Sequence, residues 1–195
     1  MTVLIACEES GVVRDAFLTQ HIDAISCDLL PTSSPGPHLE CDVLDVISEP
    51  WDMVIAHPPC TRLCNSGVRW LHERDLWSDM HAAVEFFLRM LAANAPYVAV
   101  ENPTMHGHAR SMIGPPDFAV QPYEFGDAES KRTCFWTKHL PPLLPTTPGF
   151  DPRRASHSTH LAAPSADRAR LRSMTFPGIA AAMATQWGSL IKETQ

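Results

Sequence analysis

DMVIAHPPCT, residues 52–61, is the stretch from which the fold of this chain can be inferred. Its apolar or small residues 53–56 predict a buried strand of a parallel sheet. The strand must end at Pro58–Pro59, because proline cannot donate a hydrogen bond to a neighbouring strand. Cys60 then begins the loop beyond the strand's carboxyl end, where open α/β sheets place their reactive groups. A thiol held there by a stiff turn is either a positioned nucleophile or a small buried apolar side chain.

Strands and helices alternate on both sides of this stretch. Hydrophobic patterns predict strands at Thr2–Cys7, Asp23–Cys27, Met53–Ala56 and Tyr97–Val100, a short strand or turn leading to Asp42, and further strands at Gln121–Phe125 and Thr133–Thr137. They predict helices at Gly11–Thr19, Leu76–Ala93 and Gly178–Ile191. This alternation is typical of an α/β doubly wound, Rossmann-like sheet, and the length predicts a single domain covering residues 1–195.

Composition excludes several classes of protein. The net charge of −7 argues against a general binder of polyanions, but residues 131–172 carry a local charge of +6, which leaves −13 elsewhere. Six cysteines at irregular spacing and the lack of a secretory leader predict a cytoplasmic protein. The apolar run Val3–Cys7 is too short to span a membrane, so we expect no membrane contact. Residues 139–172 are rich in proline and arginine and predict a loop.

Chemically active residues follow two neighbouring strands. Cys60 follows one, and Glu101 with Asn102 follows the next along the chain. In a right-handed βαβ unit these two strand ends lie at the same edge of the sheet. A thiol beside a carboxyl suits attack on an electron-poor ring whose nitrogen must be protonated or hydrogen-bonded. Burial and a nearby cation, for which Arg132 is the candidate, would have to activate both groups.

These motifs resemble those of the cytosine-C5 DNA methyltransferases, in a short phage or bacterial type without a target-recognition domain. Residues 56–60, AHPPC, match the nucleophile motif, and residues 101–103, ENP, match the Glu-Asn-Val motif. The resemblance implies that Cys60 attacks C6 of the pyrimidine and that Glu101 contacts N3 and the exocyclic amine. Carbon 5 then takes a methyl group from S-adenosylmethionine. The implied catalytic residues are Cys60, Glu101, Asn102 and Arg132, the last of which ends the counterpart of an Arg-x-Arg strand.

The resemblance also implies a cofactor site. The Gly-rich first motif falls on residues 9–12, where only Gly11 agrees, so carboxy-S-adenosylmethionine is an alternative donor. Asp28 matches the acidic residue that holds the ribose, and Asp42 matches the aspartate that contacts adenine. Residues 186–189 look like the C-terminal Gln-x-Gly-Asn motif, with serine in place of asparagine. The implied cofactor-binding residues are Cys7, Glu9, Ser10, Gly11, Asp28, Leu29, Asp42, Val43, His57, Pro58, Gln186, Gly188 and Ser189.

The family's target-recognition domain would fall between Trp136 and Arg172, an interval too short for a separate core. Arginines on such a loop make phosphate contacts, which give affinity without sequence information. The expected nucleic-acid-binding residues are Arg62, Lys131, Arg153, Arg154, Arg168 and Arg170. The expected partner is DNA, single-stranded or read in a short context, with a cytosine nucleotide as the alternative and a partner protein as a source of specificity. The implied location is the cytoplasm of a bacterium or of a phage-infected host.

Two other hypotheses stay open at this point. The first is a non-catalytic relative that binds S-adenosylmethionine or nucleic acid. The second is a redox or metal protein that uses Cys60 and Cys64, although no second Cys/His pair stands at zinc spacing and we expect no metal. The three cysteines beside predicted strands, Cys7, Cys27 and Cys41, are expected to pack as small hydrophobic residues.

Overall fold

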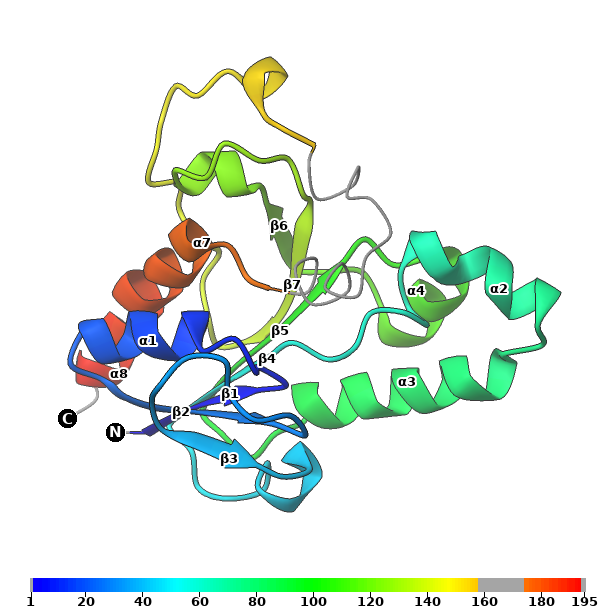
Figure 1. The fold of residues 1–195 in the computed structure, drawn as a ribbon, viewed down its shortest axis with the longest axis horizontal. Helices are drawn as coiled ribbons and strands as arrows, with labels where there is room; N and C mark the ends of the chain where they lie inside the picture. The colour runs from blue at the N-terminus through cyan, green and yellow to red at the C-terminus, as the bar shows by residue number, and fades with distance from the viewer. Residues whose placement is uncertain (1, 158–173, 194–195) are drawn as a thin grey trace.

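A central seven-stranded sheet organises residues 2–157 and 174–193, the parts of the chain that the computed structural model describes (Figure 1). Its strands are β1 (Thr2–Ala6), β2 (Asp23–Asp28), β3 (His38–Glu40), β4 (Met53–Ala56), β5 (Tyr97–Pro103), β6 (Phe118–Val120) and β7 (Thr133–Lys138). The helices are α1 (Val12–Thr19), α2 (Val68–Glu73), α3 (Trp77–Leu91), α4 (Gly107–Ile113), α7 (Pro177–Ala182) and α8 (Gly188–Glu193), with a π-helical turn at Met183–Trp187. Short 3₁₀ turns occur at η1 (Val43–Asp45), η2 (Asn65–Gly67), η3 (Pro122–Phe125) and η4 (Pro152–Arg154).

The strand order is β3-β2-β1-β4-β5-β7-β6. The first five strands in this order are parallel, and β7 runs antiparallel to both β5 and β6. The order of these five is that of the doubly wound nucleotide-binding sheet, which reverses direction between β1 and β4. The prediction of an α/β doubly wound, Rossmann-like sheet is therefore confirmed. Ligands of such sheets bind outside the carboxyl ends of the strands, at this reversal.

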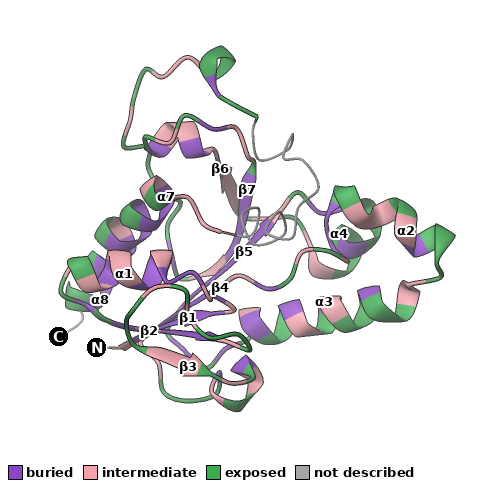
Figure 2. Ribbon diagram, viewed as in Figure 1, coloured by how far each residue is buried: buried purple, intermediate pink, exposed green. Residues whose placement is uncertain are grey.

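The core divides into one apolar layer on each face of the sheet, and Figure 2 shows the buried strands between the helices. Because side chains alternate along a strand, Met53 and Ile55 of β4 pack beneath α1 and α7, whereas Val54 and Ala56 pack against α3. All four residues of β4 are buried. A central parallel strand is covered on both faces, which explains its uninterrupted apolar sequence.

Two predicted strands differ from the structure. The strand predicted at Gln121–Phe125 is wrong, because Pro122–Phe125 forms η3 and the strand β6 lies just before it. Pro122 occupies the first position of η3, and the Gln121 backbone N–H donates to Glu124 Oε2 at 2.6 Å, which fixes a helical turn. Strand β5 also continues past Val100 to Pro103, because β7 pairs with it along that length.

The helices of residues 2–157 and 174–193 include none that is long and apolar enough to cross a membrane.

Candidate active site

The turn after β4 presents Cys60 at the reversal of the sheet. The His57 backbone N–H still donates to the Ala6 carbonyl oxygen at 2.9 Å, so the chain leaves the sheet only at the two prolines. The Leu63 and Cys64 N–H groups then both donate to the Cys60 carbonyl oxygen at 2.9 Å. Cys60 therefore begins a single tight turn, and its side chain is partly buried.

Glu101 and Asn102 lie within β5, beside this turn. Asn102 Nδ2 donates to the Pro58 carbonyl oxygen at 2.9 Å, which joins β5 to the Pro-Pro-Cys segment. Glu101 Oε2 lies 3.3 Å from His57 Nδ1, and both side chains are almost completely buried. The structure thus brings the segment that carries Cys60 together with Glu101, Asn102, His57 and Pro58.

Three buried polar atoms at this place have no hydrogen-bond partner among the described residues. They are His57 Nε2, Glu101 Oε1 and Asn102 Oδ1. Since buried polar groups are nearly always paired, each of these atoms calls for a partner, which bound water or a ligand can supply. Asn102 donates through Nδ2, so its Oδ1 is an acceptor, and a Glu101 carboxylate oxygen is one as well. The expected ligand therefore offers N–H donors.

Cys60 and Cys64 form a coupled pair of thiols. The hydrogen bond between them lowers the pKa of Cys64 to about 5, assisted against burial by the Ser66 hydroxyl, whose Oγ lies 3.0 Å from Cys64 Sγ, and by nearby backbone groups. The same hydrogen bond raises the pKa of Cys60, and burial and the charges of Cys64 and Glu101 raise it further, while Lys131 lowers it. The hydrogen bond therefore favours ionisation of Cys64 and opposes ionisation of Cys60.

The sequence suggested Arg132 as the cation beside Glu101, but the structure does not pair these two residues. Within the described parts of the chain, the side chain that contacts the Glu101 carboxyl group is His57, whose Nδ1 lies 3.3 Å from Oε2. Arg132 is exposed just before β7 and contacts the Cys134 thiol, whose pKa burial raises and Arg132 lowers. Its neighbour Lys131 has its Nζ 5.6 Å from the centre of the Phe176 ring. The reason is the register of β7, which places Phe135 rather than Arg132 opposite Glu101.

Acidic residues gather at the carboxyl ends of β1, β2 and β3. Burial raises the pKa of Cys7 to about 12, and the neighbouring charges of Asp28, Cys27 and Asp42 raise it further. Asp28 accepts from the Leu30 N–H at 3.0 Å, and Asp42 accepts from the Leu44 N–H at 2.9 Å. The structure therefore brings Cys7, Asp28 and Asp42 together. Leu29 and Val43, the predicted cofactor-binding residues that follow the two aspartates, differ in burial. Leu29 is exposed and Val43 is buried.

Glu8 also lies at this edge, although it is not among the cofactor-binding residues predicted from the sequence. Its carboxylate accepts from the Val13 N–H at 2.7 Å and the Arg14 N–H at 3.3 Å, at the start of α1. Ser10 Oγ also donates to it at 3.3 Å. In dinucleotide-binding sheets these N–H groups hold a phosphate. Because a carboxylate already binds them here, this edge is unsuited to a phosphate and suited to a ligand without one.

Gly11 makes room for an arginine. Its φ of 75° is left-handed, and a side chain there would collide with the guanidinium of Arg14. Arg14 is fully buried and donates to Ser26 Oγ at 3.1 Å and to the Ser34 carbonyl oxygen at 3.0 Å. The adjoining backbone is fixed as well, because the Glu9 carbonyl oxygen accepts from the Ser33 N–H at 2.9 Å. An arginine among the apolar residues of a short helix was the available sequence signal for this network.

The C-terminal motif is not brought to this edge. Gln186 makes two hydrogen bonds of 2.8 Å with the backbone of Leu144. Gly188 packs against Ile22, which immediately precedes β2 and so lies at the amino end of that strand. The physical reason is Trp187, which is buried in the core beneath the sheet. The prediction that Gln186, Gly188 and Ser189 bind the cofactor is therefore not supported by their positions.

The predicted nucleic-acid-binding arginines are dispersed. Arg62 Nε lies 3.3 Å from Asp79 Oδ2, and Arg153 forms two contacts of 3.0 Å with Asp151. Arg154 is exposed beside Arg153. Arg168 and Arg170 lie outside the described residues.

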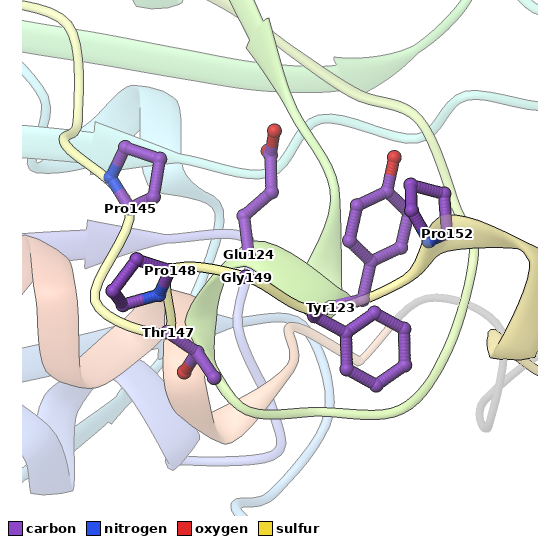
Figure 3. A pocket seen from close by; sticks show the side chains of 8 residues that line it. Tyr123, Glu124, Pro145, Thr147, Pro148, Gly149 and Pro152 are labelled. Atoms are coloured by element: carbon purple, nitrogen blue, oxygen red, sulfur yellow. The ribbon is translucent and has the colours of Figure 1, made fainter.

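An open hollow of about 360 Å³ lies in the Pro-rich region, away from these groups (Figure 3). The rings of Tyr123 and Phe150 stack beside it with centres 5.5 Å apart. Its lining residues are Tyr123, Glu124, Pro145, Thr147, Pro148, Gly149, Phe150 and Pro152. None of them is a predicted site residue. Across residues 2–157 and 174–193, no group of His, Cys, Asp and Glu side chains is placed to hold a metal ion.

Comparison with known proteins gives a distant structural similarity. No protein-family model matches the sequence, and no curated protein matches it. Among solved structures, the chain is similar to a crystal structure described as a candidate DNA modification methyltransferase encoded within a prophage of E. coli, with 14% sequence identity and a TM-score of 0.46. The match covers 70% of this chain and 46% of that one, so the chain spans less than half of that protein's length.

Proposed function

We propose that this chain is a DNA (cytosine-5-)-methyltransferase-like enzyme, which transfers a methyl group from S-adenosylmethionine to C5 of cytosine through a bond between Cys60 and C6. The observation that carries the proposal is the 2.9 Å hydrogen bond from Asn102 Nδ2 to the Pro58 carbonyl oxygen. It joins the turn that carries Cys60 to Glu101 and Asn102. A thiol and two partnerless oxygen acceptors therefore share one edge of the sheet.

The acceptors suit cytosine better than thymine or uracil. Cytosine offers an exocyclic amine with two N–H donors, whereas thymine presents a carbonyl oxygen at the same position. Glu101 Oε1 and Asn102 Oδ1 are both buried acceptors, so an amine would satisfy them and a carbonyl oxygen would leave them unpaired. Loss of such pairing is costly in a buried site, which gives selectivity for the amino-bearing ring.

The chain's residues account for the covalent step. The pKa of Cys60 is raised, so as its sulfur forms a bond to C6 the thiol proton passes to the neighbouring Cys64 or to solvent. A proton held between Glu101 and ring N3 would neutralise the charge that develops on the ring, and the contact of Glu101 with the amine would hold the ring in place for this attack. Carbon 5 becomes nucleophilic and accepts the methyl group. Loss of the C5 proton and breaking of the sulfur–carbon bond then restore the ring and the free thiol.

The residues at the ends of β1, β2 and β3 fit an adenosyl ligand. Glu8 accepts from the N–H groups at the N-terminus of α1 that would otherwise bind a phosphate, and S-adenosylmethionine contains no phosphate. Asp28 and Asp42 would accept from ribose hydroxyls and from the adenine amine. Bound there, S-adenosylmethionine would supply an electrophilic methyl group. Carboxy-S-adenosylmethionine is the alternative donor, and competition between the two donors in calorimetry would distinguish them.

A non-catalytic relative that binds S-adenosylmethionine or nucleic acid is the second candidate. It is favoured by the raised pKa of Cys60, since a protonated thiol is a poor nucleophile. The three buried partnerless atoms around Glu101 favour the enzyme, because a binding module for the cofactor alone does not need them. Turnover separates the two candidates.

Residues 1–195 correspond to one catalytic domain in this proposal. Residues 139–172 take the place of a recognition domain, so the proposed substrate is DNA read in a short context, with single strands preferred or a partner protein supplying specificity. A cytosine nucleotide is the alternative substrate.

The test is transfer of an isotopically labelled methyl group from S-adenosylmethionine to cytosine-containing oligonucleotides, followed by mass spectrometry of the released nucleosides. The proposal expects labelled 5-methylcytosine with the intact protein and none with Cys60→Ala. Glu101→Gln, which keeps the shape of the side chain, should retain cofactor binding and lose most transfer. Labelled methyl groups on adenine, or transfer that survives in Cys60→Ala, would contradict it.

A further inference from the structure

His57 is the buried titratable residue of this site to which the proposed chemistry assigns no role. It is the first residue after β4, and its backbone N–H donates to Ala6 in β1. Its side chain is 7% exposed and lies between β4 and β5. Because the backbone on both sides is fixed by the sheet and by Pro58, the ring has little freedom to move.

The contacts of the ring are asymmetric. Nδ1 lies 3.3 Å from Glu101 Oε2 and 3.5 Å from Thr175 Oγ1, which belongs to the segment before α7. Nε2 is buried and has no hydrogen-bond partner in the described parts of the chain. Nδ1 therefore makes the polar contacts of the ring, and they point to Glu101.

Glu101 is held from one side only. Its Oε2 contacts His57, whereas its Oε1 is buried without a partner within residues 2–157 and 174–193. No other charged residue pairs with it there. Without His57, the carboxyl group could rotate about its side-chain bonds and present either oxygen in several directions.

We propose that His57 is a positioning residue, whose Nδ1 fixes Glu101 Oε2 and so directs Glu101 Oε1 to the substrate ring. This inference rests on the proposed function, because it assigns Glu101 to the substrate. The resemblance placed His57 among the cofactor-binding residues, but in the structure its Nδ1 contacts the Glu101 carboxyl group and not the acidic cluster around Cys7. In this proposal Nδ1 carries the proton and donates to Glu101 Oε2, which accepts whether or not Oε1 carries a proton.

The expected effect is on the rate of the chemical step. A misplacement of a catalytic group by about 1 Å can reduce a rate by roughly 100-fold, while the binding of a cofactor held by other residues is unaffected. His57→Leu, which removes Nδ1 at similar volume, should therefore lower kcat by about 10- to 100-fold and leave the KM for S-adenosylmethionine unchanged. His57→Asn, whose Nδ2 can donate near the place of Nδ1, should recover most of the loss.

A double-mutant cycle separates positioning from a general structural role. If His57 acts through Glu101, His57→Leu should have no further effect on kcat in a Glu101→Gln background. His81 provides the matched control, since it is exposed on α3, and His81→Leu should leave kcat unchanged. Additive effects of His57→Leu and Glu101→Gln would overturn the inference, as would full activity of His57→Leu.

The contact itself is measured without turnover. In the intact protein with ¹⁵N-labelled histidine, nuclear magnetic resonance should show a proton on His57 Nδ1 whose signal shifts in Glu101→Gln. A signal that is identical in both proteins, or a proton on Nε2 alone, would overturn the inference even if His57→Leu fails to fold. If the histidine signal behaves as expected but the intact protein neither transfers methyl groups nor forms an adduct, the proposed function fails and the contact stands.

Discussion

At the scale of single residues, Cys64 raises the pKa of Cys60 through a hydrogen bond and through its charge. The sequence located Cys60 correctly at a strand end, because Pro58–Pro59 after an apolar run can be recognised locally. The influence of Cys64 could not be predicted in the same way. It depends on the turn that brings residues 60 and 64 together and on the Ser66 hydroxyl 3.0 Å from Cys64 Sγ.

The first prediction is that Cys64→Ala increases the reactivity of Cys60 at neutral pH. The hydrogen bond with Cys64 and its negative charge raise the pKa of Cys60, so their removal lowers that pKa and increases the thiolate fraction at any given pH. The measurement is the rate of alkylation by iodoacetamide against pH, with Cys60 identified by peptide mass spectrometry. The profile of Cys60 should move to lower pH. A profile that stays in place or moves to higher pH would contradict the role assigned to Cys64.

At the scale of elements, α1 is held by polar groups at its N-terminus as well as by its apolar face. Glu8 binds the first N–H groups of the helix, and Arg14 ties it to the loop between β2 and β3. The apolar stripe of α1 was predictable from the helical spacing of its apolar residues. Glu8 and Arg14 were not, because their partners lie in the three-dimensional turn or in a distant loop. The glycine at position 11 was identified, but its physical reason is the guanidinium of Arg14.

The second prediction is that Arg14→Met lowers the free energy of unfolding by about 3 kcal/mol or more, because it leaves several buried acceptors unpaired. Arg89→Met is the matched control on the exposed face of α3 and should change it by at most about 0.5 kcal/mol. Urea denaturation followed by circular dichroism measures both variants. Equal stability of the two variants would show that the buried network contributes nothing.

At the scale of the whole molecule, the parallel half of the sheet was predictable and the antiparallel half only partly so. Parallel strands are covered on both faces, and β1, β4 and β5 accordingly show continuous apolar runs. The length of β5 depends on pairing with β7, about thirty residues later, and such pairing leaves no local pattern. For the same reason the sequence placed Glu101 and Asn102 after the strand rather than within it.

The third prediction concerns substrate recognition. Arg62 and Arg153 lie on separate segments of the chain, and each is paired with an acidic residue, so they offer phosphate contacts and no element that fills a groove. We expect methylation of single-stranded oligonucleotides to exceed that of matched duplexes, with little dependence on flanking sequence. Binding should weaken steeply with added salt, because counterion release drives phosphate contacts. Modification by this chain alone of one long recognition sequence in duplex DNA would contradict the expectation.

The most direct test of the central claim is covalent trapping on an oligonucleotide in which 5-fluorocytosine replaces cytosine. The fluorine at C5 cannot leave as a proton does, so the bond between the enzyme and C6 should persist after methyl transfer. The account predicts a complex that survives denaturing electrophoresis, requires S-adenosylmethionine, and carries the modified base on Cys60 when its peptides are sequenced by mass spectrometry. Cys60→Ala should form none, whereas Cys64→Ala should still form it. A base attached to Cys64, or no adduct with an intact protein that binds both S-adenosylmethionine and the oligonucleotide, would contradict the account.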